Sequence, residues 1–237
     1  MAEEIIEQGY RELADTILEH NPGVDLGRVR AAFELADRAH SGQKRKAGTP
    51  YVTHCVAAAQ ICAEMGLDED SIVAALLHDC IEDTAITHED IARQFGAEVA
   101  DIVEGVTKLT RVQFTSREDE QMENLRKMLM AMAKDIRVIL IKIADRLHNM
   151  RTMEYMVAQK QLEKSLETME IYAPIAHRLG LQKVKWELED LSLKYLDPDG
   201  YREIITYLDS KADVLNEFMS DVKKKITDRL TEYSIHA

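Results

Sequence analysis

Apolar residues recur every three or four positions along most of the chain, which is the period of an amphipathic α-helix. This pattern predicts helices over 3–20, 26–40, 51–65, 71–83, 88–95, 97–109, 118–133, 135–151, 161–177, 181–196 and 201–234. Glycine and proline separate these segments, most clearly in SGQKRKAGTP at 41–50 and DPDG at 197–200. The sequence contains no hairpin pattern, fixed-period repeat or low-complexity segment. We therefore expect an all-α bundle of roughly ten helices.

Local signals refine these boundaries. Asp25, Asp68 or Asp70, and Thr87 each stand where a helix cap is expected. RVILIKIA at 137–144 is rich in β-branched residues and by itself resembles a buried strand. It continues into ADRLHNMR without a turn signal, so we interpret 135–151 as one helix.

Composition agrees with a helical, well-packed protein. Hydrophobic residues make up 46% of the 237 residues and charged residues 31%, whereas aromatic residues make up only 5%. The formal charge of −13 predicts a surface that repels nucleic acid and anionic membranes. No run approaches 18 apolar residues, and MAEEIIEQGY at the N-terminus lacks a signal-peptide pattern, so we expect a cytoplasmic protein that binds no membrane.

The three cysteines do not form a recognisable framework. Cys55, Cys62 and Cys80 are odd in number and include no CxxC pair, which argues against disulfides and a zinc ribbon. Cys55 and Cys80 stand beside a histidine and an aspartate, which would suit thiolate ligands. We interpret them instead as small buried apolar residues.

The segment Ser71–Asp83, SIVAALLHDCIED, concentrates titratable groups at the end of an apolar helix. Residues four apart lie one above the other, so His78 is expected beneath Glu82 and Asp79 beneath Asp83. One imidazole and three carboxylates at this spacing repel one another unless a cation holds them together.

The helix over 135–151 repeats this arrangement. Asp145, His148, Asn149 and Thr152 share one face of an otherwise apolar helix. Together with His78, Asp79 and the earlier His54, they offer the imidazole and carboxylate ligands that suit a divalent first-row metal. Taken singly, each residue fits an ordinary role: a hydrogen-bonded histidine, or an aspartate paired with a neighbouring arginine.

The order His, His-Asp, Asp resembles the signature of HD-type metal phosphohydrolases, read here as His54, His78-Asp79 and Asp145. The chain is more specifically similar to the hydrolase domain of RelA/SpoT-type enzymes over about residues 30–195, in HSGQKRKAGTPYVTH, LLHDCIEDT, FGAEVADIVEGVTKL, RKMLMAMAKDIRVILIKIADRLHNMRT and ETMEIYAPIAHRLG. The resemblance implies an HD-domain helical bundle. We expect an N-terminal helix over 1–24, the metal phosphohydrolase domain over 25–197 and a helical connector over 198–237 toward an absent synthetase domain.

The resemblance also implies residue roles. His54, His78, Asp79 and Asp145 would hold one Mn²⁺, and Glu82 and Asp83 would handle protons and the attacking water. The remaining matches would bind the substrate: Arg45 and Lys46 at the guanine, and Asn149 and Thr152 along the nucleoside pocket. Without the motif, Lys44-Arg45-Lys46 would read as a solvated loop, and His148 is interpreted as supporting or structural. Two positions depart from the family pattern, Cys55 in place of a common proline and Ala47 in place of a common serine.

The implied function is hydrolysis of (p)ppGpp, the stringent-response nucleotides, to GDP or GTP and pyrophosphate. The intact HDxxED segment at 78–83 favours an active hydrolase. Two alternatives stay open. The domain could act on another nucleotide, such as a dNTP or NADPH, or serve as a ligand-sensing module that controls an attached (p)ppGpp synthetase.

Overall fold

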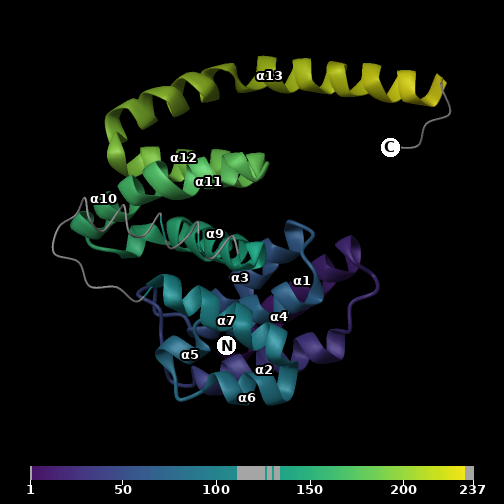
Figure 1. Ribbon diagram of the computed structural model, residues 1–237. Helices are drawn as coiled ribbons and strands as arrows, with labels where there is room; N and C mark the ends of the chain where they lie inside the picture. The colour runs from purple at the N-terminus through teal and green to yellow at the C-terminus, as the bar shows by residue number, and fades with distance from the viewer. Residues whose placement is uncertain (1, 111–125, 127–129, 131–133, 233–237) are drawn as a thin grey trace. The chain divides into compact units, whose positions relative to one another are not determined.

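The computed structural model describes residues 2–110, 126, 130 and 134–232, and its regular elements there are helices (Figure 1). The α-helices are α1 (Ala2–His20), α2 (Leu26–Ala39), α3 (Val52–Glu64), α4 (Glu69–Leu77), α5 (Cys80–Asp83), α6 (His88–Phe95), α7 (Ala97–Thr110), α9 (Ile136–Arg151), α10 (Ala158–Glu167), α11 (Ala173–Arg178), α12 (Gln182–Leu196) and α13 (Pro198–Glu232). A 3₁₀ turn covers Met153–Tyr155 and a π turn covers Thr168–Tyr172. The predicted all-α class is confirmed. The helix predicted over 118–133 lies outside the described residues except at positions 126 and 130.

Backbone contacts divide the chain into Met1–Ser192 and Leu193–Ala237. In the first unit α3 packs against α1, α4 and α9, and α4 also packs against α2 and α7. Residues 71–77 of α4 are all buried, so this helix lies in the core. Because α3, α4 and α9 pack against one another, the polar residues on these three helices come together in one region of the interior. The second unit is formed by the end of α12 and by α13.

Several helix starts follow the sequence signals. The carboxylate of Asp25 accepts the Gly27 N–H at 2.9 Å, and that of Asp68 accepts the Ser71 N–H at 2.9 Å. Thr87 opens α6 with a reciprocal capping box. Each such cap contributes about 1 kcal/mol by satisfying a backbone N–H that has no partner within the helix.

The prediction of one continuous helix over 71–83 is wrong. The helix is interrupted at His78-Asp79, between α4 and α5, and Asp79 has φ −96° and ψ −5°. In an uninterrupted helix the Ala75 carbonyl would accept the Asp79 N–H, but here it receives the Nδ1–H of His78 at 2.8 Å. The Asp83 N–H still bonds the Asp79 carbonyl at 2.9 Å, so the predicted alignment of these two residues survives the break.

Two later boundaries also differ from the prediction. The helix expected over 161–177 begins earlier, at Ala158, and contains the π turn, in which the Ala173 N–H bonds the Thr168 carbonyl. Pro174 follows this turn at once and has no N–H to continue an α-helical ladder. The turn expected at 197–200 is a break at Asp197 alone, because Pro198 already begins α13 and the Asp197 carboxylate accepts the Gly200 N–H at 3.0 Å.

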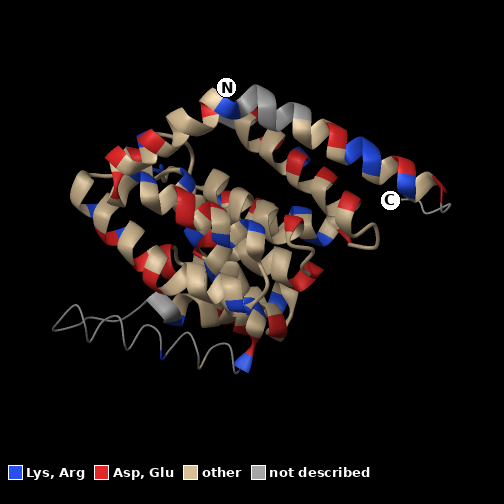
Figure 2. Ribbon diagram, turned by 90° about the horizontal axis from the view of Figure 1, so that it is seen from above, with Lys and Arg blue, Asp and Glu red and all other residues tan. Residues whose placement is uncertain are grey.

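Acidic residues are distributed along the helices with lysine and arginine between them (Figure 2). Within the described ranges, no helix combines the length and the apolar character required to cross a bilayer.

Candidate metal centre

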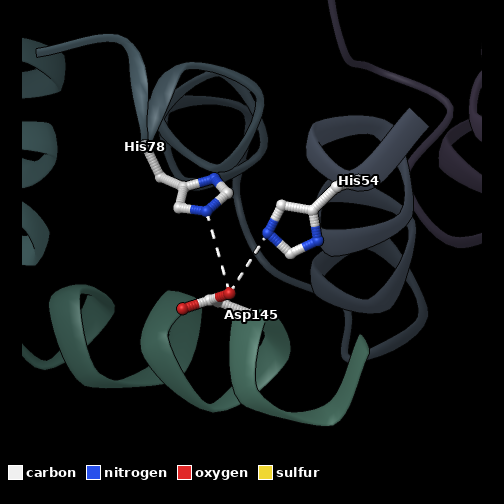
Figure 3. Close-up of side chains that lie close together, drawn as sticks. All are labelled: His54, His78 and Asp145. Atoms are coloured by element: carbon white, nitrogen blue, oxygen red, sulfur yellow. Dashed lines mark ion pairs between the residues drawn. The ribbon is translucent and has the colours of Figure 1, made fainter. Parts of the chain in front are cut away.

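Three separate parts of the chain bring the predicted ligands together (Figure 3). His54 lies in the first turn of α3, His78 and Asp79 lie at the break between α4 and α5, and Asp145 lies on α9. The Nε2 atoms of His54 and His78 lie 3.2 and 3.9 Å from Asp145 Oδ1. Asp79 Oδ2 lies 3.1 Å from His78 Nε2 and 3.7 Å from His54 Nε2. Ligand atoms of His54, His78 and Asp145 all lie within 4.8 Å of one another, and these three residues are buried.

The ring orientation of His78 leaves one nitrogen suited to a metal. Its Nδ1 faces the Ala75 carbonyl, which can only accept, so Nδ1 carries a proton. Its Nε2 is buried without a hydrogen-bond partner and faces the two aspartates. Burial alone would lower the pKa of His78, but Asp79 and Asp145 outweigh burial and raise the pKa to about 9. A positive charge is therefore favoured at this point, either a proton on Nε2 or a cation bound to it.

Asp145 is fixed by two neighbours on its own helix. Lys142 Nζ lies 2.6 Å from Oδ2, and the Asn149 amide donates to Oδ1 at 2.5 Å. Burial would raise the pKa of Asp145, but Lys142 and His54 outweigh burial and hold the pKa well below its usual range. Asp145 is thus an ionised carboxylate whose Oδ1 faces both imidazoles.

The Nε2 atom of His54 faces the carboxylates of Asp79 and Asp145, and its Nδ1 atom faces His148. Its Nδ1 lies 2.6 Å from Nδ1 of His148. Burial lowers the pKa of His54, and Asp145 opposes this only in part, so the neutral imidazole is favoured.

These donors fit a divalent first-row metal. Two neutral imidazole nitrogens and two ionised carboxylates form a common ligand set for such ions. Two carboxylates that lie 3.1 and 3.9 Å from one imidazole nitrogen also favour positive charge between them, and that nitrogen, Nε2 of His78, has no hydrogen-bond partner. His54, His78, Asp79 and Asp145 are therefore the residues that would hold the ion.

Tyr51, which was not among the predicted site residues, links the candidate ligand Asp79 to Asp83. Its hydroxyl donates to Asp79 Oδ2 at 2.7 Å and lies 3.2 Å from Asp83 Oδ2. Burial, followed by the charge of Asp79, raises the pKa of Tyr51 far above its usual range, so the hydroxyl remains a donor. Its position three residues before His54 at the start of a helix was the signal available in the sequence.

The structure brings only some of the predicted substrate-binding residues into contact with one another. Arg45 Nη2 donates to Asn149 Oδ1 at 2.5 Å, so these two predicted residues meet beside Asp145. Lys46 is exposed in the same loop. Thr152 donates its hydroxyl to the His148 and Asn149 carbonyls at 3.1 and 3.4 Å, which satisfies the end of α9. Asp83 is exposed and Glu82 half-buried, one turn beyond the ligands.

The cysteines, Arg146 and Lys142 complete the surroundings of the site. All three cysteines are free and buried, as the packing interpretation expected. Arg146, the neighbour considered for Asp145, instead pairs with Glu167 at 3.0 Å and lies over the ring of Tyr172. Lys142 was also missed, although its place three residues before Asp145 on an apolar helix was a usable signal.

Residues 32–182 match the family described as HD domain, and the chain belongs to this family. The predicted resemblance to RelA/SpoT-type enzymes is confirmed by three relatives. The chain is 48% identical over 219 residues to a probable GTP pyrophosphokinase of Mycobacterium leprae, covering 92% of this chain and 28% of that protein. It is 45% identical over 226 residues to the bifunctional (p)ppGpp synthase/hydrolase SpoT of Escherichia coli K12, covering 95% and 32%. It is 48% identical over 204 residues to a probable guanosine-3′,5′-bis(diphosphate) 3′-pyrophosphohydrolase of Synechocystis, covering 86% and 27%. The chain thus spans only about a quarter to a third of each relative.

Proposed function

We propose that this chain is the hydrolase domain of a (p)ppGpp 3′-pyrophosphohydrolase that uses Mn²⁺. The observation that carries the proposal is the convergence of His54, His78, Asp79 and Asp145 from three parts of the chain around the partnerless Nε2 of His78. The activities for which two relatives are named supply the substrate class, a guanosine 3′,5′-bis(diphosphate). The same ligands also suit Fe²⁺ or Zn²⁺, so the choice of Mn²⁺ rests on the family resemblance.

In the proposed reaction, water attacks the phosphorus that carries the ribose 3′-oxygen, and the bond between that phosphorus and the 3′-oxygen breaks. A bound divalent cation would supply Lewis acidity toward a phosphate oxygen and a water molecule. Glu82 and Asp83 would take a proton from the water and return one to the leaving 3′-oxygen, which gives GDP or GTP and pyrophosphate. General acid–base help of this kind is worth about 10²–10⁴-fold.

Chain groups beside the ligands would orient these steps. Tyr51 holds the Asp83 carboxylate near Asp79, where a proton donor or acceptor is needed. Arg45 lies against Asn149 at the ligand Asp145, so a nucleotide bound by the loop at 41–50 would place its 3′-diphosphate near the metal. Arg45, Lys46, Asn149 and Thr152 are proposed as the groups that line the nucleoside site.

The test is pyrophosphate release from ppGpp by the purified chain, with Mn²⁺ and with excess chelator. Asp79→Asn should abolish release, whereas Asp101→Asn, outside the site, should not. Release by Asp79→Asn at the wild-type rate in metal-replete buffer would refute the proposal. A panel of dNTPs and NADPH, scored for pyrophosphate against orthophosphate, separates this activity from that of an HD hydrolase acting on another nucleotide.

A second candidate function has its own support. Three relatives at 48% or 44% identity are named for GTP pyrophosphokinase activity, and the chain spans less than a third of each. In a longer bifunctional protein this domain could sense a guanine nucleotide and control a synthetase C-terminal to it. Nucleotide binding without any product from the isolated chain would favour this regulatory role, and turnover would favour the hydrolase.

A further inference from the structure

His148 lies three residues after Asp145 on α9 and meets His54 of α3 ring to ring. Their Nδ1 atoms are 2.6 Å apart, and the ring centroids are 4.9 Å apart at an interplanar angle of 37°. His54 is only 1% exposed, so water cannot replace this contact easily.

A contact this short between two ring nitrogens needs one N–H and one lone pair. A neutral imidazole carries a single ring proton, so the role of each Nδ1 depends on what the other nitrogen does. If His54 Nε2 offers its lone pair to a metal, the His54 proton must be on Nδ1. The Nδ1 of His148 must then accept, and the proton of His148 must be on its Nε2.

We propose that His148 is a positioning residue, which fixes the tautomer and the ring direction of His54 so that Nε2 can bind the divalent metal. The inference rests on the proposed function, because it assumes that His54 is a ligand. His78 shows the same arrangement with a different acceptor, since its Nδ1 donates to the Ala75 carbonyl. The two imidazoles of the site would thus each be oriented by an acceptor behind them, one from the backbone and one from a side chain.

The short contact itself requires a neutral His148, because an acceptor needs a lone pair on Nδ1. A protonated His148 would place two N–H groups head to head at 2.6 Å, with no lone pair between them.

Variants of His148 separate positioning from simple space filling. In His148→Asn an amide oxygen can take the place of Nδ1, whereas in His148→Leu the volume is largely kept and the acceptor is lost. His177→Leu on α11 is the matched control, because His177 is exposed and outside the site. Urea unfolding of each metal-free variant first establishes that it folds.

The measurement is the dissociation constant for Mn²⁺ alone, obtained by calorimetric titration without nucleotide. We expect His148→Leu to weaken Mn²⁺ binding by about 10- to 100-fold, the usual effect of removing a group that orients a metal-binding histidine. His148→Asn should keep most of the affinity and His177→Leu all of it. Equal affinity in folded His148→Leu and wild type, or equal losses in the Leu and Asn variants, would overturn the inference.

A second measurement uses only the wild-type chain, so it does not depend on the folding of any variant. Imidazole-nitrogen NMR of the wild-type chain with diamagnetic Zn²⁺ should find the His148 proton on Nε2 and the His54 proton on Nδ1. A proton on His148 Nδ1 would overturn the inference while leaving the proposed hydrolase intact. A wild-type chain that binds neither Mn²⁺ nor Zn²⁺ would overturn both proposals, so the two failures are distinguishable.

Discussion

Lys142 and Asp145 form a buried ion pair one turn apart on α9, with Nζ 2.6 Å from Oδ2. The lysine occupies one carboxylate oxygen and leaves Oδ1 to face the two imidazoles. Burial alone would lower the pKa of Lys142, but Asp145 outweighs burial and keeps the ammonium charged. The charge of Asp145 is therefore stabilised by a neighbour on its own helix.

Removing the Lys142 ammonium should destabilise the metal-free protein more than the metal-bound protein. In Lys142→Met, Asp145 keeps its charge without its main partner, and breaking a buried pair in this way costs about 3–5 kcal/mol. Because Mn²⁺ can supply positive charge at the same carboxylate, the loss should be smaller with the metal. Urea unfolding with and without Mn²⁺ measures both values. The control is Lys185→Met, whose partly exposed pair with Glu189 should matter by less than about 1 kcal/mol.

Loss of the Tyr51 hydroxyl should slow catalysis more than it weakens metal binding. Tyr51→Phe removes the donor shared by Asp79 and Asp83 and keeps the ring. A hydrogen bond to a charged group is worth about 1.5–3 kcal/mol, so kcat for ppGpp hydrolysis should fall by at least about tenfold. The matched control is Tyr155→Phe, since Tyr155 is exposed on the surface. An unchanged kcat in Tyr51→Phe would exclude a positioning role for this hydroxyl.

Metal should stabilise the fold. Mn²⁺ at about 100 times its dissociation constant adds about 2.7 kcal/mol, which raises Tm by roughly 5–10 °C for a chain of this size. Thermal unfolding followed by circular dichroism, with Mn²⁺ or with chelator, measures the shift. Asp145→Asn should abolish it.

The matched control for that shift is Asp101→Asn, in the more exposed cluster of His88, Asp101 and Glu104. This variant should keep the shift if the buried site is the one that takes the ion. Equal melting temperatures with and without saturating Mn²⁺ in the wild type would contradict metal binding at the buried cluster.

The ion pair between Arg146 and Glu167 should make the free energy of unfolding depend on pH. Burial would raise the pKa of Glu167, but Arg146 and Lys164 outweigh burial and hold the pKa below its ordinary value of 4.5. A lowered folded pKa adds stability above the unfolded pKa, and this stability is lost as pH falls through the folded pKa. Glu167→Gln should therefore cost about 3 kcal/mol at pH 7, and this difference should shrink below about pH 4.5.

Urea unfolding at several pH values measures this change. Glu163→Gln, at a more exposed pair with Lys160, serves as the control and should unfold like the wild type. If the free energies of unfolding of Glu167→Gln and wild type differ by the same amount from pH 7 to pH 3, the negative charge of Glu167 is not what stabilises the fold.

The sequence by itself predicted most of the helices and named the residues that the structure brings together as the candidate metal centre. Period, caps and breaks are local properties, so the starts at Asp25 and Thr87 could be read directly, and the start of α4 was narrowed to Asp68 or Asp70, of which Asp68 is the cap. The resemblance of the order His54, His78-Asp79 and Asp145 to the HD signature named the residues that meet. Burial supplies the physical reason, because an ionisable group rising from a buried apolar helix needs a partner.

Only the tertiary structure decided which groups contact those residues and their neighbours. The break at His78 depends on a side-chain bond to Ala75 that competes with the helix ladder. The contact between His54 and His148 joins residues 94 positions apart, and Arg146 pairs with Glu167 rather than with Asp145. The last two contacts depend on how α3 and the end of α10 pack against α9, and helical period does not encode that packing.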